Sequence, residues 1–298
     1  MRAWPAIVIL AASFAACGGS PPPTPGNASP ATPPPSALIE IPRAADQPPF
    51  PPSHMQGVAN PAKGDLDAIV ARGYLRVLVA PSPTQFAFIK GFLRGRSHDI
   101  GQALQAFLNK QEGVSRVPVL LISTPEEALV TDLLAGKGDI AANLLVTFER
   151  DDQVAFAAPV RKGIRELVVT GPGEPALVSL EDVGGRTIHV RRSSDHYSSL
   201  IRLNQQLKGI NRPPARIVIA PADASDEALL EMVNSGKIPA TITDDYLFDL
   251  SRKTLTSIAA NRDVAVSQDG VLAWATRKDA PKLLALMNEF FSTHKLTF

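Results

Sequence analysis

Two apolar stretches of this chain end in polar side chains whose types suit the binding of a small ligand. LLVTFERDD presents a hydroxyl and a guanidinium, Thr147 and Arg150, directly after an apolar run. PATITDD ends in a similar way, at Thr243, Asp244 and Asp245. If both runs are strands, these side chains lie at strand ends, where ligands bind in α/β proteins. The alternative for Arg150 is a solvated loop in which it pairs with a neighbouring acid.

A third polar cluster contains every residue type of a serine-hydrolase triad. Ser193, Ser194, Asp195 and His196 are consecutive, however, and stand where a helix is expected to begin. The members of a triad converge in space from separate elements, which four residues in a row at a helix start cannot do. A helix cap is therefore the favoured interpretation, and no catalytic residue is predicted.

Composition and spacing exclude several other kinds of site. The five histidines show no HExxH or other paired spacing, and the single cysteine excludes a multi-cysteine metal site. The segments GGR and GPG lack the spacing of a phosphate loop. We therefore predict no metal and no other cofactor. A net charge of +1 without long basic runs also argues against nucleic acid as a partner.

From Gly64 onward, the elements that must position these groups alternate between strands and helices. Apolar runs predict strands at 75–80, 117–122, 139–146, 186–190, 216–220 and 239–243, and helical spacing predicts helices at about 65–72, 98–110, 195–208 and 226–235. Thr124, Pro125 and Glu127 form the expected start of one more helix, which ends at Gly136. This alternation is typical of an α/β fold with mainly parallel sheets and helices on both faces.

The two halves of this pattern echo each other. The residues EAL and GK at 127–129 and 136–137 recur one hundred positions later, at 227–229 and 236–237. In both places a capped helix leads into a strand of small residues that reaches a polar end. Two lobes of one architecture, with matching strand ends facing each other across a cleft, would explain the echo. Chance similarity between two βαβ units is the alternative.

The N-terminal residues differ from the rest of the chain. MRAWPAIVILAASFAAC has one arginine, an apolar run too short to span a bilayer, and the only cysteine. It resembles a bacterial lipoprotein signal that is cleaved before Cys17, whose thiol then carries lipid. An acylated Cys17 would hold the protein at a membrane surface, and the absence of an aspartate after it favours the outer membrane. An ordinary secretory signal with a chance cysteine is the alternative.

A proline-rich segment follows this signal. Fourteen of the 27 prolines lie between positions 18 and 61, in runs such as PPPTP and ATPPPS. Such a segment buries little surface and favours extended conformations, so it predicts a disordered tether, with a proline-rich partner ligand as the alternative. The expected organisation is a signal peptide at 1–16, a lipidated tether at 17–61 and a folded domain at 62–298.

Several motifs of the folded domain resemble the family 3 periplasmic solute-binding proteins. IVARGYLRVLVAPSPTQF, GKGDIAANLLVTFERDDQVAFAAPV and SLEDVGGRTIHVRRSS carry this resemblance. More narrowly, GGRTIHVRRSSDHYSSLIRLN and EALLEMVNSGKIPATITDDYLFDL resemble the binding module of the membrane-bound lytic murein transglycosylases F. The resemblance covers residues 65 to 298. It implies a two-lobed, type II periplasmic-binding-protein-like α/β fold that closes over a small solute.

The resemblance also implies where the two lobes lie along the chain. Lobe 1 is expected at about 65–166 and 270–298, and lobe 2 at about 167–269. The chain would cross between the lobes near Glu166–Thr170 and Val264–Val271. A C-terminal helix at 281–292 would return to lobe 1.

In lobe 1, the family's Thr-x-x-Arg motif matches Thr147 and Arg150. The resemblance implies that this guanidinium grips a ligand carboxylate, to which its fork can donate two parallel hydrogen bonds. Leu145 departs from the family, which usually has Ser or Thr there, and the lost hydrogen bond is worth about 1 kcal/mol. Phe86 and Phe88, after the first strand, are expected to form an aromatic wall of the cleft, with the core as the alternative.

In lobe 2, Ser193 and Ser194 match the hydroxyls at a helix start whose backbone N–H groups and dipole favour an anion. Asp244, or Asp245 in its place, matches the acidic residue that takes a ligand ammonium. Oppositely charged walls would then orient a zwitterion. Because Leu145 removes one expected contact, the ligand stays open among an amino acid, a short peptide and a muropeptide fragment.

The expected function is that of a non-catalytic binding protein of the cell envelope, for transport or sensing. The transglycosylases carry a helical catalytic domain after the binding module, with a catalytic Glu usually followed by Ser. This chain ends at Phe298, where that domain would begin, and contains no Glu-Ser pair, so we expect no lyase activity. The expected partners are a small-molecule ligand, the membrane through the N-terminal lipid, and an ABC transporter permease or another envelope protein. The chain itself is expected to be a monomer.

Two other functions stay open. In the first, the chain is a truncated or partner-dependent transglycosylase. In the second, it is a degenerate pair of lobes that serves as a scaffold without a small ligand, as Leu145 would hint.

Overall fold

The computed structural model describes residues 57–89, 92–114 and 116–294. The predicted signal peptide, Cys17 and nearly all of the predicted tether lie outside these residues. The described residues form one compact unit. Among the described residues, every helix is too short or too polar to cross a membrane.

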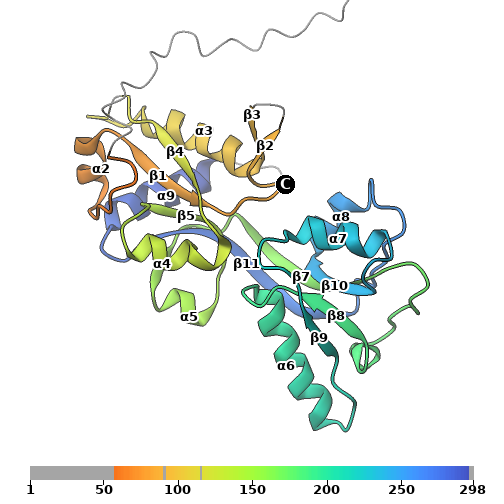
Figure 1. Ribbon diagram of the computed structural model, residues 1–298. Coiled ribbons are helices and arrows are strands. Elements are labelled where there is room, and N and C mark those ends of the chain that lie inside the picture. The colour runs from red at the N-terminus through yellow and green to blue at the C-terminus, as the bar shows by residue number, and fades with distance from the viewer. Residues whose placement is uncertain (1–56, 90–91, 115, 295–298) are drawn as a thin grey trace, which may run out of the picture. The chain divides into compact units, whose positions relative to one another are not determined.

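One mixed sheet of nine strands runs through this unit (Figure 1), in the order β4-β1-β5-β11-β7-β10-β8-β9, with β6 paired to β11. Its strands are β1 (Leu75–Val79), β4 (Val119–Ser123), β5 (Ile140–Leu145), β6 (Val154–Phe156), β7 (Arg161–Thr170), β8 (Thr187–Val190), β9 (Arg216–Ile219), β10 (Ala240–Asp244) and β11 (Ala265–Arg277). A separate hairpin is formed by β2 (Ala87–Ile89) and β3 (Phe92–Arg94).

The strands predicted from apolar runs are present in the sheet, each within a few residues of its expected bounds. Parallel pairing joins β1 to β4 and β5, and β8 to β9 and β10. Antiparallel pairing comes from β7 and β11, which pair with each other and with their neighbours. The sheet is mixed because these two long strands are added to two parallel groups.

The strands β7 and β11 each belong to two lobes. From Arg161 to Leu167, β7 pairs with β11, and from Glu166 to Thr170 it pairs with β10. The second half of β11 pairs with β5 and β6. Both segments that the resemblance implies as lobe crossings, 166–170 and 264–271, fall on these strands. Glu166 pairs with both neighbours and therefore stands where one lobe passes into the other.

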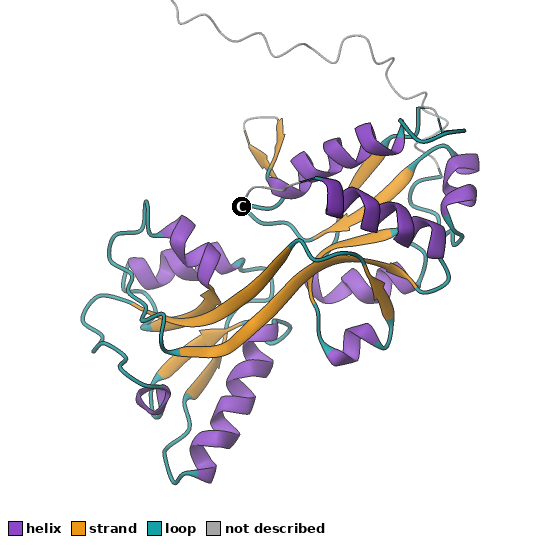
Figure 2. Cartoon of the chain, turned by 180° about the vertical axis from the view of Figure 1, so that it is seen from behind, coloured by secondary structure: helices purple, strands orange, loops and turns teal. Residues whose placement is uncertain are grey.

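Helices cover both faces of the sheet in each lobe (Figure 2). In lobe 1, α2 (Leu66–Arg72), α3 (Arg96–Leu108) and α9 (Pro281–Thr293) share one apolar core, and α4 (Leu129–Leu134) packs in another. In lobe 2, α6 (Asp195–Gly209) packs in one core, and α7 (Asp226–Asn234) and α8 (Asp245–Ser251) pack in the other. The described residues also form three shorter helical turns: α5 (Phe148–Asp151), η1 (Glu126–Ala128) and η2 (Leu180–Val183).

The predicted helix start at Thr124 differs from the structure. Pro125 is extended, with a ψ of 142°, and a 3₁₀ turn over Glu126–Ala128 precedes α4. The hydroxyl of Thr124 donates to the carbonyl of Ile122 and forms no helix cap. The capping-box prediction was wrong because these residues turn the chain after β4 before the helix begins. The turn leaves Glu126 and Glu127 at the carboxyl end of that strand.

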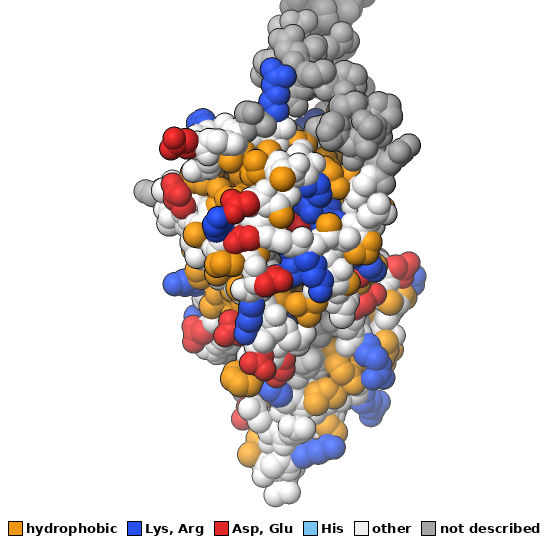
Figure 3. Space-filling view, turned by 90° about the vertical axis from the view of Figure 1, so that its left-hand side faces the viewer, with side chains coloured by type: hydrophobic (Ala, Val, Ile, Leu, Met, Phe, Trp, Pro, Cys, Tyr) orange, Lys and Arg blue, Asp and Glu red, His pale blue; other side chains and the backbone are white. Residues whose placement is uncertain are grey.

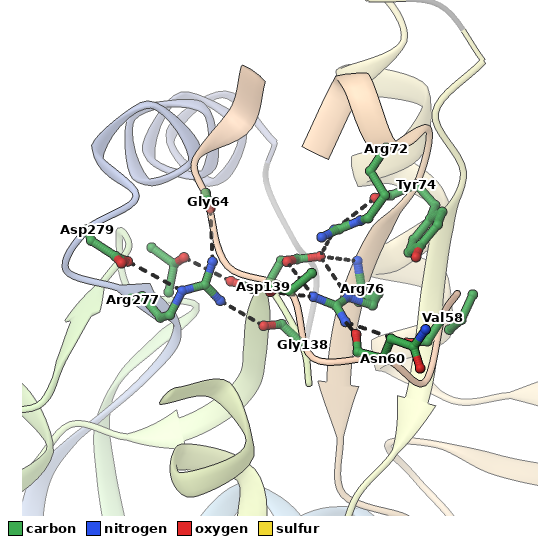
Figure 4. A network of polar contacts seen from close by, with 12 residues as sticks. Val58, Asn60, Gly64, Arg72, Tyr74, Arg76, Gly138, Asp139, Arg277 and Asp279 are labelled. Atoms are coloured by element: carbon green, nitrogen blue, oxygen red, sulfur yellow. Dashed lines mark hydrogen bonds and ion pairs between the residues drawn. The ribbon is translucent and has the colours of Figure 1, made fainter. Parts of the chain in front are cut away.

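A buried network of charged side chains lies in lobe 1, on the side opposite the carboxyl ends of its parallel strands (Figure 4). Arg76, in the interior of β1, is 0% exposed, and its guanidinium donates to Asp139 and to the carbonyls of Asn60 and Ala62. The same carboxylate accepts from Arg72 and from the backbone N–H of Arg76. This network ties the segment before α2 to β1 and to the start of β5.

Gly95, just before α3, allows the chain to pass close to the loop that follows β1. Its φ is +117°, and a Cβ there would lie 2.4 Å from the carbonyl oxygen of Gln85. The chain before Gln85 carries Ser82 and Thr84, which follow β1. No residue except glycine therefore combines this backbone conformation with this close approach.

We expect Gly95→Ala to lower the free energy of unfolding by about 2–3 kcal/mol, because it combines backbone strain with a steric clash. Urea unfolding followed by circular dichroism measures this change. The matched control is Gly209→Ala at the end of α6, where nothing lies within 4 Å of the added methyl group. That change is expected to be neutral or slightly stabilising. Equal effects of the two substitutions would contradict the role assigned to Gly95.

Candidate functional site

A cavity of about 400 Å³ lies between the two lobes, at the carboxyl ends of their parallel strands. Lobe 1 contributes the chain that follows β1 and β4 and the end of β5, and lobe 2 contributes the chain that follows β8, β9 and β10. Glu166 on β7 and Leu272 on β11 line it from the crossing strands. Parallel strands end at the same edge of a sheet, which brings loops from distant parts of the sequence to one place.

The start of α6 forms part of the wall. Ser194 is the N-cap residue, and its hydroxyl accepts from the backbone N–H of Tyr197 at 3.3 Å and donates to the carbonyl of Arg191 at 2.8 Å. Ser194 lines the cavity, whereas Ser193 is exposed and does not. The cluster is thus a helix cap, and the imidazole of His196 points to Asp244, with 3.3 Å between Nε2 and Oδ1.

Arg150 connects the two lobes. Its Nη1 donates to the carbonyl of Leu145 and to Oδ2 of Asp195, both at 2.9 Å. Thr147 is the N-cap of α5, and its hydroxyl accepts from the backbone N–H of Arg150. Neither Thr147 nor Arg150 lines the cavity, whereas Asp195 and Leu145 do. The guanidinium therefore contacts a carboxylate of lobe 2 rather than one of the acids beside it in the sequence.

This ion pair predicts a measurable coupling between the lobes. The side chains of Arg150 and Asp195 are both mostly buried, so the pair should be worth about 1 kcal/mol, at the upper end for such contacts. A double-mutant cycle with Arg150→Ala and Asp195→Ala, measured by urea unfolding, gives this number directly. If the two single effects simply add, the pair is not formed in solution.

A group of buried titratable side chains surrounds His196. Although burial opposes its charge, the hydrogen bond with Asp244 and the nearby carboxylates of Asp226 and Glu166 raise the pKa of His196 to about 10. Burial, together with the charges of Asp244 and Asp226, raises the pKa of Tyr246 well above its usual value. At neutral pH, His196 is therefore a cation that is paired with Asp244.

Glu166 has no such partner. It is 3% exposed, it lines the cavity, and its Oε2 has no hydrogen-bond partner among the residues that the structure describes. Burial raises the pKa of Glu166, and the nearby carboxylates of Asp244 and Asp195 raise it further, against the opposing effects of His196 and Ser199. A buried carboxylate oxygen without a donor is unusual in a native structure and calls for an explanation.

Three predicted site residues lie elsewhere. Phe86 is 8% exposed in the core of lobe 1, and Phe88 is 71% exposed on β2. Asp245 begins α8, with 3.8 Å between its Oδ2 and Nη1 of Arg262. None of the three lines the cavity. For Phe86 the core was the alternative interpretation of the sequence.

Two further interlobe contacts involve residues that the sequence did not single out as site residues. Arg191 donates to Glu126 of lobe 1 at 2.6 Å and to Asp226 of lobe 2 at 2.9 Å. Glu227 accepts hydrogen bonds from the hydroxyls of Ser82 and Thr84 at 3.0 and 2.5 Å. Four of these residues lie shortly after predicted strands: Ser82, Thr84, Glu126 and Arg191. Asp226 and Glu227 begin the predicted helix 226–235. A position between the end of a strand and the start of the next helix is the signal that could have identified them.

Comparison with known proteins agrees with this architecture. Residues 75–297 match the family described as bacterial extracellular solute-binding proteins, family 3. Solved structures with a similar fold include the protein AbpA from Streptococcus pneumoniae bound to L-arginine, with a TM-score of 0.63 at 19% identity over 76% of this chain and 91% of that one. Holo ArgBP from T. maritima has a TM-score of 0.60 at 20% identity, over 76% and 93% of the two chains. The fold is thus the type II periplasmic-binding fold.

Curated relatives share about half of their length with this chain. Membrane-bound lytic murein transglycosylase F of Desulfosudis oleivorans is 27% identical over 225 residues, which cover 75% of this chain and 46% of the relative. The protein of the same name from Yersinia pestis is 28% identical over 236 residues, which cover 78% and 45%. The chain thus spans about half the length of these relatives.

Proposed function

Because the chain belongs to the bacterial extracellular solute-binding proteins of family 3, we propose that it binds a small solute in the cavity between its lobes. The cavity itself carries this proposal. It is enclosed by loops from both lobes at the carboxyl ends of parallel strands, and its 400 Å³ falls within the range of small-molecule sites. The protein acts by binding and not by catalysis.

Among the predicted site residues, Ser194 and Asp244 are the proposed ligand contacts, because both line the cavity. Thr147 and Arg150 are proposed to act indirectly, by holding Asp195 and the start of α6 in place. Glu166 and Glu227 are added to the proposed contacts. Ser193, Asp245, Phe86 and Phe88 are left out of the proposed site because they do not line the cavity.

The class of solute is proposed from the relatives. Amino acids are supported by structural neighbours that were solved with arginine, and a muropeptide fragment by relatives that are named murein transglycosylases. The proposed location is the cell envelope, with lipid on Cys17 as the anchor, preferentially at the outer membrane. An ABC transporter permease or another envelope protein is the proposed partner.

A thermal-unfolding screen of the purified protein tests the proposal. Amino acids, short peptides, muropeptides and organic amines are added singly, and one class should raise the melting temperature by several degrees in a concentration-dependent way. Asp152→Asn, which changes an exposed acid outside the cavity, should leave the profile unchanged. A complete lack of stabilisation by every class would contradict solute binding.

The relatives' name favours a second candidate, a binding module that serves a transglycosylase. In that case the chain acts with a catalytic domain that is joined to it or held by a partner. Release of anhydro-muropeptides from purified murein, with the chain alone and with such a domain added, separates the two. Product formed only with the added domain, and faster in the presence of the chain, would favour the second candidate.

A further inference from the structure

The cavity between the lobes is strongly acidic. Among the described residues, eight carboxyl side chains line it, against two basic ones, Arg191 and His196. On the face in Figure 3, by contrast, acidic and basic side chains are interspersed, and the net charge of the whole chain is only +1. The excess of acid is therefore a property of the cavity and not of the whole protein.

The basic groups at this cavity are already neutralised. Arg191 lies between Glu126 and Asp226, and His196 is paired with Asp244. Two more arginines lie near Tyr246 without lining the cavity: Arg161 stacks over its ring at 4.8 Å, and Arg96 lies close enough to affect its phenol. Neither Glu166 nor Glu227 takes part in the ion pairs of Arg150, Arg191 and His196 described above.

Glu166 is the acidic residue of the cavity that lies on a crossing strand between the lobes. Its unpartnered Oε2 lies at the crossing of the lobes, in a residue that is 97% buried. Burying a carboxylate without a partner is costly, and a hydrogen-bonded cation removes most of that cost. A ligand that donates from a charged nitrogen at this point would satisfy the oxygen.

The place that a ligand carboxylate would take is occupied by the protein itself. The carboxylate of Asp195 stands in the first turn of α6, where the helix dipole favours an anion, and it accepts from Arg150. A second carboxylate at this place would meet the charge of Asp195. The chain thus supplies internally the anion that an amino-acid ligand would bring.

We propose, building on the proposed solute-binding function, that the cavity takes a small organic cation without a carboxylate, whose charged nitrogen donates to Glu166. A primary amine or a guanidinium compound has this chemistry. A metal ion does not fit as well, because the described residues contain no group of three or more His, Cys, Asp or Glu side chains that could hold one.

Two pairs of solutes test this proposal, because the members of each pair differ only by a carboxylate. The full chain is titrated by isothermal calorimetry with agmatine and arginine, and with cadaverine and lysine, at neutral pH. We expect each amine to bind about tenfold or more tightly than its amino acid, the equivalent of one charge-assisted contact.

The results separate this inference from the proposed function. Tighter binding of arginine and lysine than of their amines overturns the cation inference and leaves solute binding intact. Binding of only neutral or anionic solutes has the same consequence. If neither these four solutes nor amino acids, peptides and muropeptides bind, both proposals fail.

Variants then locate the bound cation. Glu166→Gln should weaken agmatine binding about tenfold or more, because it replaces the charged acceptor by a neutral one. The control is Asp152→Asn, an exposed acid outside the cavity, which should leave the affinity unchanged. A cooperative thermal transition of Glu166→Gln shows that the variant is folded. Unchanged affinity in that folded variant would overturn the assignment of Glu166.

Discussion

Replacement of Asp139 by asparagine is expected to lower the free energy of unfolding by about 3–5 kcal/mol. The isosteric change keeps the volume and one acceptor but removes the negative charge that faces Arg72 and Arg76. The guanidinium of Arg76 is 0% exposed, so its charge would remain buried without a counter-ion. Removal of one partner of a buried ion pair is costly for this reason.

Urea unfolding of wild type and Asp139→Asn measures this difference. The matched control is Asp132→Asn, which breaks the ion pair of Asp132 with the half-exposed side chain of Lys137 and should cost less than 1 kcal/mol. A cost below 1 kcal/mol for Asp139→Asn as well would mean that Arg76 reaches another anion or water when the carboxylate is lost.

The second large effect is a pH dependence of stability that His196 controls. Its pKa is about 10 in the folded protein, compared with 6.5 for an ordinary histidine. A raised pKa in the folded state stabilises the protein fully below pH 6.5, and this stabilisation is lost as the pH rises towards 10. Between pH 7 and pH 9 the contribution of His196 should fall by roughly 2.5 kcal/mol.

Urea unfolding of wild type and His196→Gln across this pH range checks the expectation. The two stability curves should converge as the pH rises. In Asp244→Asn the imidazole keeps an acceptor but loses the negative charge of its partner, so part of this pH dependence should disappear, while Asp226 and Glu166 maintain the rest. Parallel curves of wild type and His196→Gln from pH 7 to pH 9 would show that the histidine is not charged in the folded protein.

The elements were predictable from the sequence because each lobe repeats a local pattern. Apolar runs such as LRVLVA and RIVIA predicted the strands, and Ser194 and Ser225 begin their helices as N-caps. The lengths of β7 and β11 were harder to predict from the sequence. Their sequences alternate irregularly because one half of each strand packs in lobe 1 and the other in lobe 2.

The contacts between the lobes could not be predicted from local patterns. Arg150 and Asp195 are 45 positions apart, and Glu227 and Thr84 are 143 apart. Only the relative position of the two lobes brings them together. The burial of Arg76 could not be predicted for a similar reason. A charged residue inside an apolar strand is buried only if a partner such as Asp139 lies near it.

Leu145 was the first sign that the ligand site departs from the family. It lines the cavity, and its carbonyl accepts from the guanidinium of Arg150. The prediction that Arg150 grips a ligand carboxylate stays untested. Leu145 lacks the hydroxyl that the resemblance implies, and Asp195 stands against Arg150. Both features favour a ligand that accepts fewer hydrogen bonds from the protein and donates more to it.

The most direct test of the account is a crystal structure of the protein grown with saturating agmatine. We predict density for the ligand in the cavity between the lobes, with a charged nitrogen about 3 Å from the carboxylate of Glu166. The pair of Arg150 and Asp195 should stay intact in this complex. An empty cavity at saturating ligand, or a ligand bound only outside it, would contradict the account.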